Sequence, residues 1–244
     1  MHPPPVDRRR APAKLTLSLR VVGRRPNGYH LLEAEMVTLD LADELEFSDG
    51  DGIEVVGPAA AGVPTDDANL VARALAAVGR RARVRIHKRI PAGAGLGGGS
   101  ADAAAVLRWA GCQDLGVAAR LGADVPFCLL GGRARVTGVG EVVEPLPFQD
   151  GTYTLLIPPV SVPTAEVYRR WDGLGGPIGD NGNDLEPAAL ATVPLLARWR
   201  DELAEATGRR PRLAGSGGTW FVEGAFPGTG RLIVKSDEAG DRVG

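Results

Sequence analysis

A glycine-dense loop runs directly into an alanine-rich stretch at residues 91–107, PAGAGLGGGSADAAAVL. Five of the seven positions from 93 to 99 are glycine, although glycine loses more conformational entropy on folding than any other residue. The alanines that follow favour a helix over residues 100–111, with Ser100 as its N-cap. The first turn of a helix leaves backbone N–H groups unpaired and carries a partial positive charge, so bare backbone in front of it suits an anion. We therefore interpret residues 91–101 as a phosphate-binding loop.

Other phosphate loops share part of this pattern but not its context. Residues 93–98 satisfy G-x-G-x-x-G, yet a dinucleotide-binding fold places that motif after its first strand and an acidic residue at the end of its second. Here several strand-like segments precede the loop and a helix follows it. A P-loop ends in Gly-Lys-Ser/Thr, whereas this loop ends in Gly99-Ser100. From the residues alone, a flexible loop without a ligand is the alternative, and the immediate start of a helix argues against it.

The composition argues against several classes of protein. Of the 244 residues, 44% are hydrophobic, which is enough for one large domain or two small ones. The net charge of −2 provides no basic excess for nucleic acid. Apolar runs such as FCLL are too short to cross a bilayer, and MHPPPVDRRR at the N-terminus has no apolar segment of the kind that a secretory signal needs. We expect a cytoplasmic protein with no nucleic-acid or membrane partner.

Two residue types are rare enough to be informative. Cys112 and Cys128 lack the spacing of a metal site and lie among apolar or small residues, so we expect both to be buried free thiols in a reducing compartment. Only three of the 28 cationic side chains are lysine: Lys14, Lys88 and Lys235. Lysine is a compact point charge and arginine a wide planar fork. A lysine in this arginine-rich chain therefore indicates a position that needs lysine, with chance drift as the alternative.

The order of the predicted elements indicates an α+β fold with two lobes. Strand-like alternation comes first, and mixed helices and strands follow a proline-rich break near residues 144–152. We assign residues 1–10 to a disordered tail, residues 11–150 to an N-terminal lobe that carries the loop, and residues 151–244 to a C-terminal lobe.

The first predicted strand, residues 11–22, alternates between two faces. Leu15 and Leu19 lie on one face and Lys14 on the other, a pattern typical of a half-buried strand. Residues 36–47 alternate again, and we expect them to pair with the first strand.

A phosphoryl-transfer enzyme also needs a group that receives a hydroxyl proton and a positive charge near the transferring phosphoryl group. The segment LGADVPFCL places Asp124 alone among apolar residues, where a carboxylate needs a partner or a function. Lys14, on the polar face of the first strand, is a candidate partner that would keep Asp124 ionised. Considered by itself, Asp124 is more typical of a turn or a helix cap.

Aromatic residues follow a predicted turn at NGYH. The Asn27-Gly28 pair indicates the turn, and Tyr29 and His30 come directly after it. A flat ring can stack on a nucleotide base, and an imidazole can hydrogen-bond the edge of the base. Tyr168, after the segment PPVSVPTAEVY, offers a second ring. Spacing alone favours an ordinary hairpin end for the first two residues and core packing for the third.

Together these segments resemble the GHMP kinases, a family of small-molecule kinases. Residues 91–97 match the family's P-x-x-x-G-L-G loop. Within the family, the long glycine loop and the Gly-Tyr-His turn are similar to those of the member that acts on a cytidine-diphosphate-linked polyol. The matching stretches keep the expected order over most of the chain: APAK, GRRPNGYHLLE, PAGAGLGGGSADAA, LGADVPF, GVGE, SVPTAEVY, NDLE and LAGSGG.

The resemblance implies a two-lobed GHMP kinase fold, with a ribosomal-S5-domain-2-like N-terminal lobe and a shortened, ferredoxin-like C-terminal lobe. It implies that ATP and Mg²⁺ are used to phosphorylate the 2-hydroxyl of 4-(cytidine 5'-diphospho)-2-C-methyl-D-erythritol, in the non-mevalonate route to isoprenoid precursors. The protein would act as a monomer or a homodimer. The alternatives are another GHMP kinase, acting on mevalonate, homoserine or a sugar, and an inactive nucleotide-binding protein of the same fold.

The resemblance also assigns catalytic and nucleotide-binding residues. Lys14 and Asp124 match the catalytic pair of the family. The ATP loop is matched by eleven residues: Pro91, Ala92, Gly93, Ala94, Gly95, Leu96, Gly97, Gly98, Gly99, Ser100 and Ala101. Magnesium is expected to be held mainly by phosphates and water, and Ser100 is a better candidate for a side-chain ligand than Asp102.

The substrate-binding positions of the family are matched by five residues: Thr16, Tyr29, His30, Thr164 and Tyr168. Cytosine is expected to stack between the rings of Tyr29 and Tyr168. Thr16 stands where the family usually has asparagine, so one substrate contact loses its amide donors.

Overall fold

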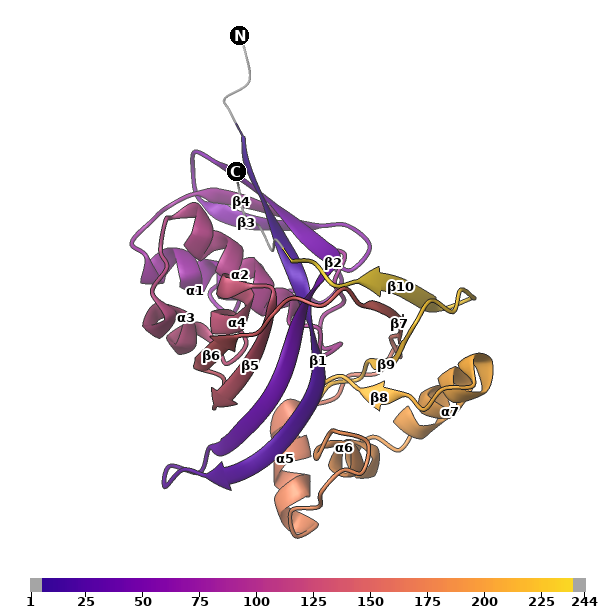
Figure 1. Cartoon of the computed structure of the whole chain (residues 1–244). Coiled ribbons are helices and arrows are strands. Elements are labelled where there is room, and N and C mark those ends of the chain that lie inside the picture. The colour runs from indigo at the N-terminus through magenta and orange to yellow at the C-terminus, as the bar shows by residue number, and fades with distance from the viewer. Residues whose placement is uncertain (1–5, 239–244) are drawn as a thin grey trace.

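The computed structural model describes residues 6–238 as an α+β structure with two β-sheets (Figure 1). Its strands are β1 (Asp7–Arg24), β2 (His30–Ser48), β3 (Gly52–Val56), β4 (Arg83–His87), β5 (Arg133–Gly138), β6 (Val142–Pro145), β7 (Thr152–Leu156), β8 (Arg212–Leu213), β9 (Trp220–Glu223) and β10 (Arg231–Lys235). Its helices are α1 (Leu70–Ala77), α2 (Gly98–Trp109), α3 (Leu115–Leu121), α4 (Val125–Leu130), α5 (Thr164–Gly173), α6 (Glu186–Thr192) and α7 (Leu196–Thr207).

Strand β2 organises the first sheet. One edge of β2 pairs antiparallel with β1 from Asp7 to Arg24, which confirms the predicted pairing of the first two strands. The other edge pairs with β5 through residues 32–37 and with β4 through residues 44–48. Strand β3 pairs in parallel with β4, and β6 pairs antiparallel with β5. Helices α1–α4 gather on one side of this sheet, and the β1–β2 ribbon extends beyond it as a long hairpin (Figure 1).

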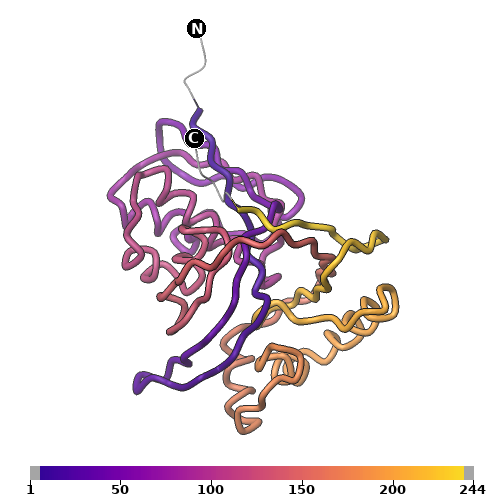
Figure 2. Tube along the Cα trace, in the orientation of Figure 1, coloured from indigo at the N-terminus to yellow at the C-terminus, as the bar shows by residue number. Residues whose placement is uncertain are grey.

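The second sheet is antiparallel, in the order β10-β7-β9-β8. Strand β7, the first strand of this sheet along the chain, directly follows the proline-rich segment where the sequence predicts a break. Helix α7 packs against β9, where the indole N–H of Trp220 donates to the Leu196 carbonyl at 3.1 Å. Helix α5 lies beside the far part of the β1–β2 ribbon (Figure 2). Because buried side chains of both sheets share common clusters, the lobe boundary at residue 150 stays a prediction.

Residues 7–10 are the first residues of β1 and not part of a tail, so this part of the tail prediction is wrong. They pair with residues 44–47 of β2, and the Arg8 guanidinium lies 2.8 Å from the Glu46 carboxylate. Charged residues that suggested a solvated segment therefore form cross-strand pairs. The tail prediction for residues 1–5 lies outside the described residues.

Strand β1 is buried on both faces in its middle part, not on one face as predicted. Residues 11–16 are all buried. Leu15 packs with side chains of β7, β9 and β10, whereas Leu19 belongs to the cluster formed with α1–α4. The register against β2 shifts between Thr16 and Ser18, and such a shift changes which face of a strand a side chain meets. A simple alternating pattern could not reveal that two layers share this strand.

Helix boundaries near the loop differ from the prediction. Helix α2 begins at Gly98 with Gly97 at its N-cap position, so Ser100 lies inside the first turn and does not cap the helix. Residues 125–130 form the short helix α4.

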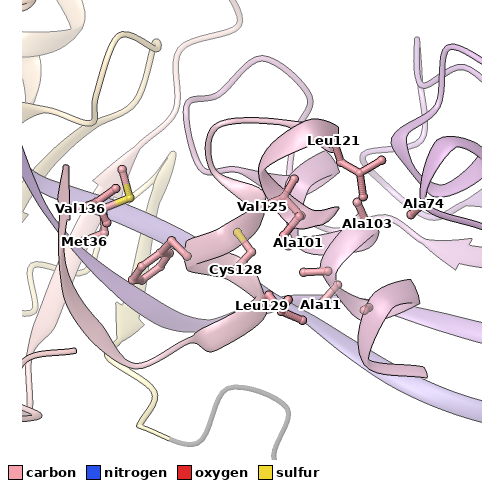
Figure 3. Packing of buried hydrophobic residues seen from close by; sticks show 14 of the residues in the cluster. Ala11, Met36, Ala74, Ala101, Ala103, Leu121, Val125, Cys128, Leu129 and Val136 are labelled. Atoms are coloured by element: carbon pink, nitrogen blue, oxygen red, sulfur yellow. The ribbon is translucent and has the colours of Figure 1, made fainter. Parts of the chain in front are cut away.

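Helix α2 lies in the main hydrophobic core. Four of its alanines have no exposed surface: Ala101, Ala103, Ala104 and Ala105. Small side chains let neighbouring elements approach closely, and Ala101 lies beside Val125 and Cys128 of α4 (Figure 3).

Burial raises the pKa of the Cys128 thiol to about 12, so the thiol stays protonated. Both cysteines are free, but Cys112 is only partly buried, contrary to the prediction.

The buried amide of Asn183 ties the second sheet to β1. Asn183 forms a parallel β-bridge with Leu19. Its Nδ2 donates to the carbonyls of Leu213 at 2.8 Å and Gly215 at 2.7 Å, and its Oδ1 accepts from the N–H of Leu185 at 2.9 Å. These bonds fix the turn that follows β8.

Replacing Asn183 with alanine is expected to lower the free energy of unfolding by about 2–4 kcal/mol, because two buried carbonyls and one N–H lose their partner. Urea denaturation measures the change. Asn181→Ala is the matched control, since the Asn181 amide donates to the Pro211 carbonyl in less buried surroundings; we expect a cost of about 0.5–1.5 kcal/mol there. Equal costs for the two variants would contradict the role given to Asn183.

Candidate active site

The predicted phosphate loop lines a cavity of about 320 Å³. Ten of the eleven residues predicted to bind ATP line it, from Pro91 to Ser100. Ala101 does not, because its side chain is buried in the core beneath the loop. Another part of the wall comes from a segment that the sequence analysis did not identify: Gly62, Val63, Pro64, Ala68, Asn69 and Leu70. Nothing in the local sequence of this segment indicates which cavity it borders.

The glycines of the loop are required by contacts with the protein as well as by any ligand. A Cβ at Gly95 would lie 2.8 Å from the Ala214 carbonyl oxygen, and one at Gly97 would lie 2.8 Å from Cγ of Lys14. A Cβ at Gly98 would lie 2.9 Å from a neighbouring isoleucine side chain. Gly97 also has a φ of +68° at the start of α2, a conformation that favours glycine. Close packing thus accounts for three glycines that the sequence analysis assigned to phosphate binding alone.

Strand β1 places Lys14 against this loop. The register with β2 shifts just before Lys14, and its backbone N–H donates to the Leu96 carbonyl at 3.0 Å. The side chain then runs along Gly97. Its Nζ lies 3.4 Å from Oδ2 of Asp124 and donates to the Thr16 hydroxyl at 3.0 Å. The structure therefore brings the predicted catalytic pair and one predicted substrate-binding residue together at the loop.

Asp124 occupies the N-cap position of α4, but its carboxylate makes no capping hydrogen bond. The following residues Val125 and Phe127 are fully buried and anchor the helix. The Asp124 side chain itself is 33% exposed, so the expectation that it is buried among apolar neighbours is wrong. Because the carboxylate is partly exposed and caps no backbone N–H, a ligand can reach it.

A second glycine turn, residues 214–218, lies between the predicted catalytic pair and the predicted substrate-binding residue Thr164. A Cβ at Gly215 would lie 3.5 Å from the Thr16 hydroxyl oxygen. The hydroxyl of the next residue, Ser216, shares a hydrogen bond of 3.0 Å with the hydroxyl of Thr164. The sequence analysis noted this turn only as a matching stretch, and it did not predict Ser216 as a site residue.

The predicted substrate-binding rings lie differently from the expectation. His30 stacks on Tyr168 with ring centroids 4.8 Å apart and 22° between the planes. The His30 Nε2 lies 2.8 Å from Oδ1 of Asp172, a residue that was not predicted. Burial raises the pKa of Tyr168, which keeps its phenol neutral. Tyr29 is 64% exposed. His30 therefore covers one face of the Tyr168 ring, where the prediction expected a base.

Magnesium would meet few protein ligands at the loop. Ser100 lies in the first turn of α2 and lines the cavity. Oδ2 of Asp102 accepts a hydrogen bond of 2.7 Å from Lys88 and is already engaged. Among residues 6–238, the one group of three side chains close enough to share an ion lies outside the lining of this cavity: Glu44, Glu46 and His87. With Ser100 as the available side chain near the loop and Asp102 engaged, the cavity fits a magnesium ion that is carried mainly by the nucleotide's phosphates.

Comparisons with known proteins agree on one family. The model of the GHMP kinases N terminal domain matches residues 69–132. A protein of Cereibacter sphaeroides (strain KD131 / KCTC 12085), named 4-diphosphocytidyl-2-C-methyl-D-erythritol kinase, is 39% identical over 241 residues, which cover 86% of this chain and 87% of that protein. A protein of the same name from Paracoccus denitrificans (strain Pd 1222) is 40% identical and covers 89% of this chain and 87% of its own. The chain belongs to the 4-diphosphocytidyl-2-C-methyl-D-erythritol kinases.

Solved structures agree with this family. A crystal structure of 4-(cytidine 5'-diphospho)-2C-methyl-D-erythritol kinase has a TM-score of 0.69 at 34% identity and covers 88% of this chain and 89% of its own. A homoserine kinase from Cytophaga hutchinsonii shares the fold, with a TM-score of 0.59 at 19% identity. The match covers 98% of this chain and 96% of the homoserine kinase. The architecture is the two-lobed GHMP kinase fold, and this family member is a phosphotransferase. None of the helices within residues 6–238 has the length and apolar character needed to span a membrane.

Gly95→Ala is expected to lower the free energy of unfolding by about 2 kcal/mol or more, because the residue has a φ of +79° and its new methyl group would meet the Ala214 carbonyl. Gly99→Ala is the control: its Cβ would have no neighbour closer than 3.7 Å, and alanine is favoured inside a helix. Thermal denaturation measures both variants. If Gly95→Ala were as stable as the control, the loop would not pack on the second glycine turn as described.

Proposed function

We propose that the protein transfers the γ-phosphate of ATP to the 2-hydroxyl of 4-(cytidine 5'-diphospho)-2-C-methyl-D-erythritol. The observation that carries the proposal is the ion pair of Lys14 and Asp124, which lies against the glycine loop through Gly97. Relatives at 39–40% identity over most of the chain have the name of a kinase for this diphosphocytidyl compound. Such a reaction belongs to the non-mevalonate route to isoprenoid precursors.

Asp124 orients the acceptor hydroxyl and takes its proton. The carboxylate is 33% exposed, so the hydroxyl can approach it within hydrogen-bond reach. Lys14, with its Nζ 3.4 Å away, provides the opposite charge. The same ammonium stabilises the negative charge that develops on the hydroxyl oxygen as the proton leaves.

The glycine loop binds the triphosphate on backbone N–H groups. The first turn of α2 adds its partial positive charge at the end of the loop. Val63, Pro64 and Leu70 give the facing part of the wall an apolar character that suits an adenine ring. Magnesium supplies charge neutralisation to the phosphate oxygens when it is bound, and Ser100 is the side chain that would help to hold it.

The β1–β2 hairpin and α5 provide the surface that would hold the cytidine end. His30 and Tyr168 present stacked rings there, and Tyr29 is exposed at the end of the hairpin. The hydroxyl of Thr164 lies at the start of α5, next to the second glycine turn. The Thr16 hydroxyl accepts from Lys14, so it supports the catalytic pair. Binding energy from this remote end can fix the reacting hydroxyl near the γ-phosphate.

Another GHMP kinase activity is the alternative. Solved structures of homoserine and mevalonate kinases share the fold at 19% and 13% identity, and a shared fold does not determine the substrate. Mevalonate and homoserine have no base to stack on the rings of His30 and Tyr168, which favours a nucleotide-linked acceptor. An inactive protein would not need the pairing of Lys14 with Asp124. The enzyme would work in the cytoplasm as a monomer or a homodimer.

Asp124→Asn is expected to lower kcat by at least about 100-fold, because an amide cannot take the hydroxyl proton. The affinity for ATP should stay within a few-fold of the wild type, since the phosphate loop is unchanged. A coupled ADP-release assay measures turnover, and calorimetry measures ATP binding. Asp201→Asn, at an exposed acid on α7, is the control for loss of a carboxylate. Retained turnover in the Asp124 variant would remove this residue from the mechanism.

The substrate assignment is tested by the same assay with two acceptors. We expect turnover with the cytidine-diphosphate-linked methylerythritol and none with mevalonate, because the rings on the hairpin and α5 bind the cytidine end. Turnover with mevalonate alone would reverse the assignment.

A further inference from the structure

Lys88 is buried between two carboxylates next to the predicted phosphate loop and is not part of the Lys14–Asp124 ion pair. Its Nζ lies 2.5 Å from Oδ2 of Asp43 and 2.7 Å from Oδ2 of Asp102. The three side chains are at most 4% exposed. Burial acts to lower the pKa of Lys88, but Asp102 and Asp43 more than offset it, so the net pKa is raised and the ammonium persists. We call these three residues the buried triad.

The buried triad joins the segments on either side of the loop. Asp43 belongs to β2, Lys88 directly follows β4, and Asp102 lies in α2. The second oxygen of Asp43, Oδ1, accepts from the backbone N–H groups of Arg89 at 2.5 Å and Ile90 at 2.9 Å. Asp43 therefore fixes the chain just before the loop, and Asp102 fixes the helix just after it.

We propose that Asp43, Lys88 and Asp102 are positioning residues for nucleotide binding, because the buried triad sets the spacing between the strand that enters the phosphate loop and the helix that leaves it. The proposal rests on the proposed function, in which ATP is the ligand of the loop. The triad acts through the loop's backbone amides, whose positions must match the phosphate oxygens. Lys88 and Asp102 also line the cavity, so their charge acts on the triphosphate at short range.

The geometry of the triad requires a lysine. A Cβ at Gly98 would lie 3.1 Å from the Lys88 Nζ, so the first residue of α2 already packs against the ammonium. An arginine guanidinium is wider and distributes its donors over a planar fork. Its extra atoms would displace either Gly98 or one of the two carboxylates. This constraint explains one of the three lysines in a chain with 28 cationic side chains.

The triad contains one more acid than base. Oδ1 of Asp102 is buried and has no hydrogen-bond partner among the described residues. Burial, opposed by Lys88 and assisted by Asp43, raises the pKa of Asp102 to about 7. The bond of Oδ2 with Lys88 is therefore the contact through which Asp102 acts.

Lys88→Met and Lys88→Arg test the requirement for lysine. Calorimetric titration with MgATP, without an acceptor substrate, should show binding weakened at least about tenfold in both variants. With the acceptor present, KM for ATP should rise by a larger factor than kcat falls. Lys235→Met, at an exposed position of β10, is the matched control and should bind ATP like the wild type.

An ATP affinity within about twofold of the wild type in either folded Lys88 variant would overturn the proposal. Because the titration uses no acceptor, a wrong acceptor assignment would not change its outcome. Failure of the proposed function and failure of this proposal are therefore distinguishable.

Asp102→Asn provides a second test that does not depend on the Lys88 variants remaining folded. The amide oxygen can still accept from Lys88, whereas Asp102→Leu removes this acceptor at a similar side-chain volume. Without an acceptor substrate, MgATP should bind to Asp102→Leu at least about tenfold more weakly than to the wild type, and Asp102→Asn should keep the affinity within about threefold of the wild type. Thermal denaturation checks that both variants are folded. Equal affinities of the two folded variants would overturn the proposal, whereas a merely structural role would lower the Tm of Asp102→Leu and leave its affinity for MgATP unchanged.

Discussion

The phosphate loop and the 214–218 turn touch backbone to backbone, and the geometry of the site depends on this contact. A Cβ at Gly217 would lie 2.5 Å from the Cα of Gly95, so no side chain fits between them. The Thr219 hydroxyl donates to the Ala94 carbonyl at 2.6 Å beside the same contact. The loop from the N-terminal half is thereby built onto the second sheet. Glycine at these positions joins two parts of the protein and also leaves backbone N–H groups open to a ligand.

The chemistry of single segments in the sequence predicted which residues gather at the candidate active site. The glycine run before an alanine-rich helix predicted the loop because bare backbone and a helix start favour an anion. Asp124 and Lys14 were expected to pair, and their charged atoms lie 3.4 Å apart. The resemblance supplied the family that the comparisons then showed. The loop could be predicted because it depends on neighbouring residues, and the Lys14–Asp124 pair because an acid among apolar residues needs a partner.

Features that depend on contacts between distant segments could not be predicted in this way. Nothing local in residues 62–70 shows that they border the loop cavity. The stack of His30 on Tyr168 requires the hairpin to lie beside α5, and Asp172 adds a hydrogen bond that only this arrangement allows. Alternation predicted a half-buried first strand, but a shift in register and a second layer bury both faces of residues 11–16.

The acidic partners of Lys14 and Lys88 differ in exposure, and this difference separates the roles proposed for the two lysines. Asp124 is 33% exposed, and its distance of 3.4 Å from the Lys14 Nζ is long for a charge-assisted hydrogen bond. Asp43 and Asp102 are at most 4% exposed and lie within 2.7 Å of Lys88. A proton acceptor must exchange its partner for the substrate, so an accessible and loosely held carboxylate suits catalysis. A positioning residue must keep its partners, so short bonds and full burial suit the triad. One residue type can thus serve both proposed roles, because the surrounding structure decides whether its acidic partner can leave.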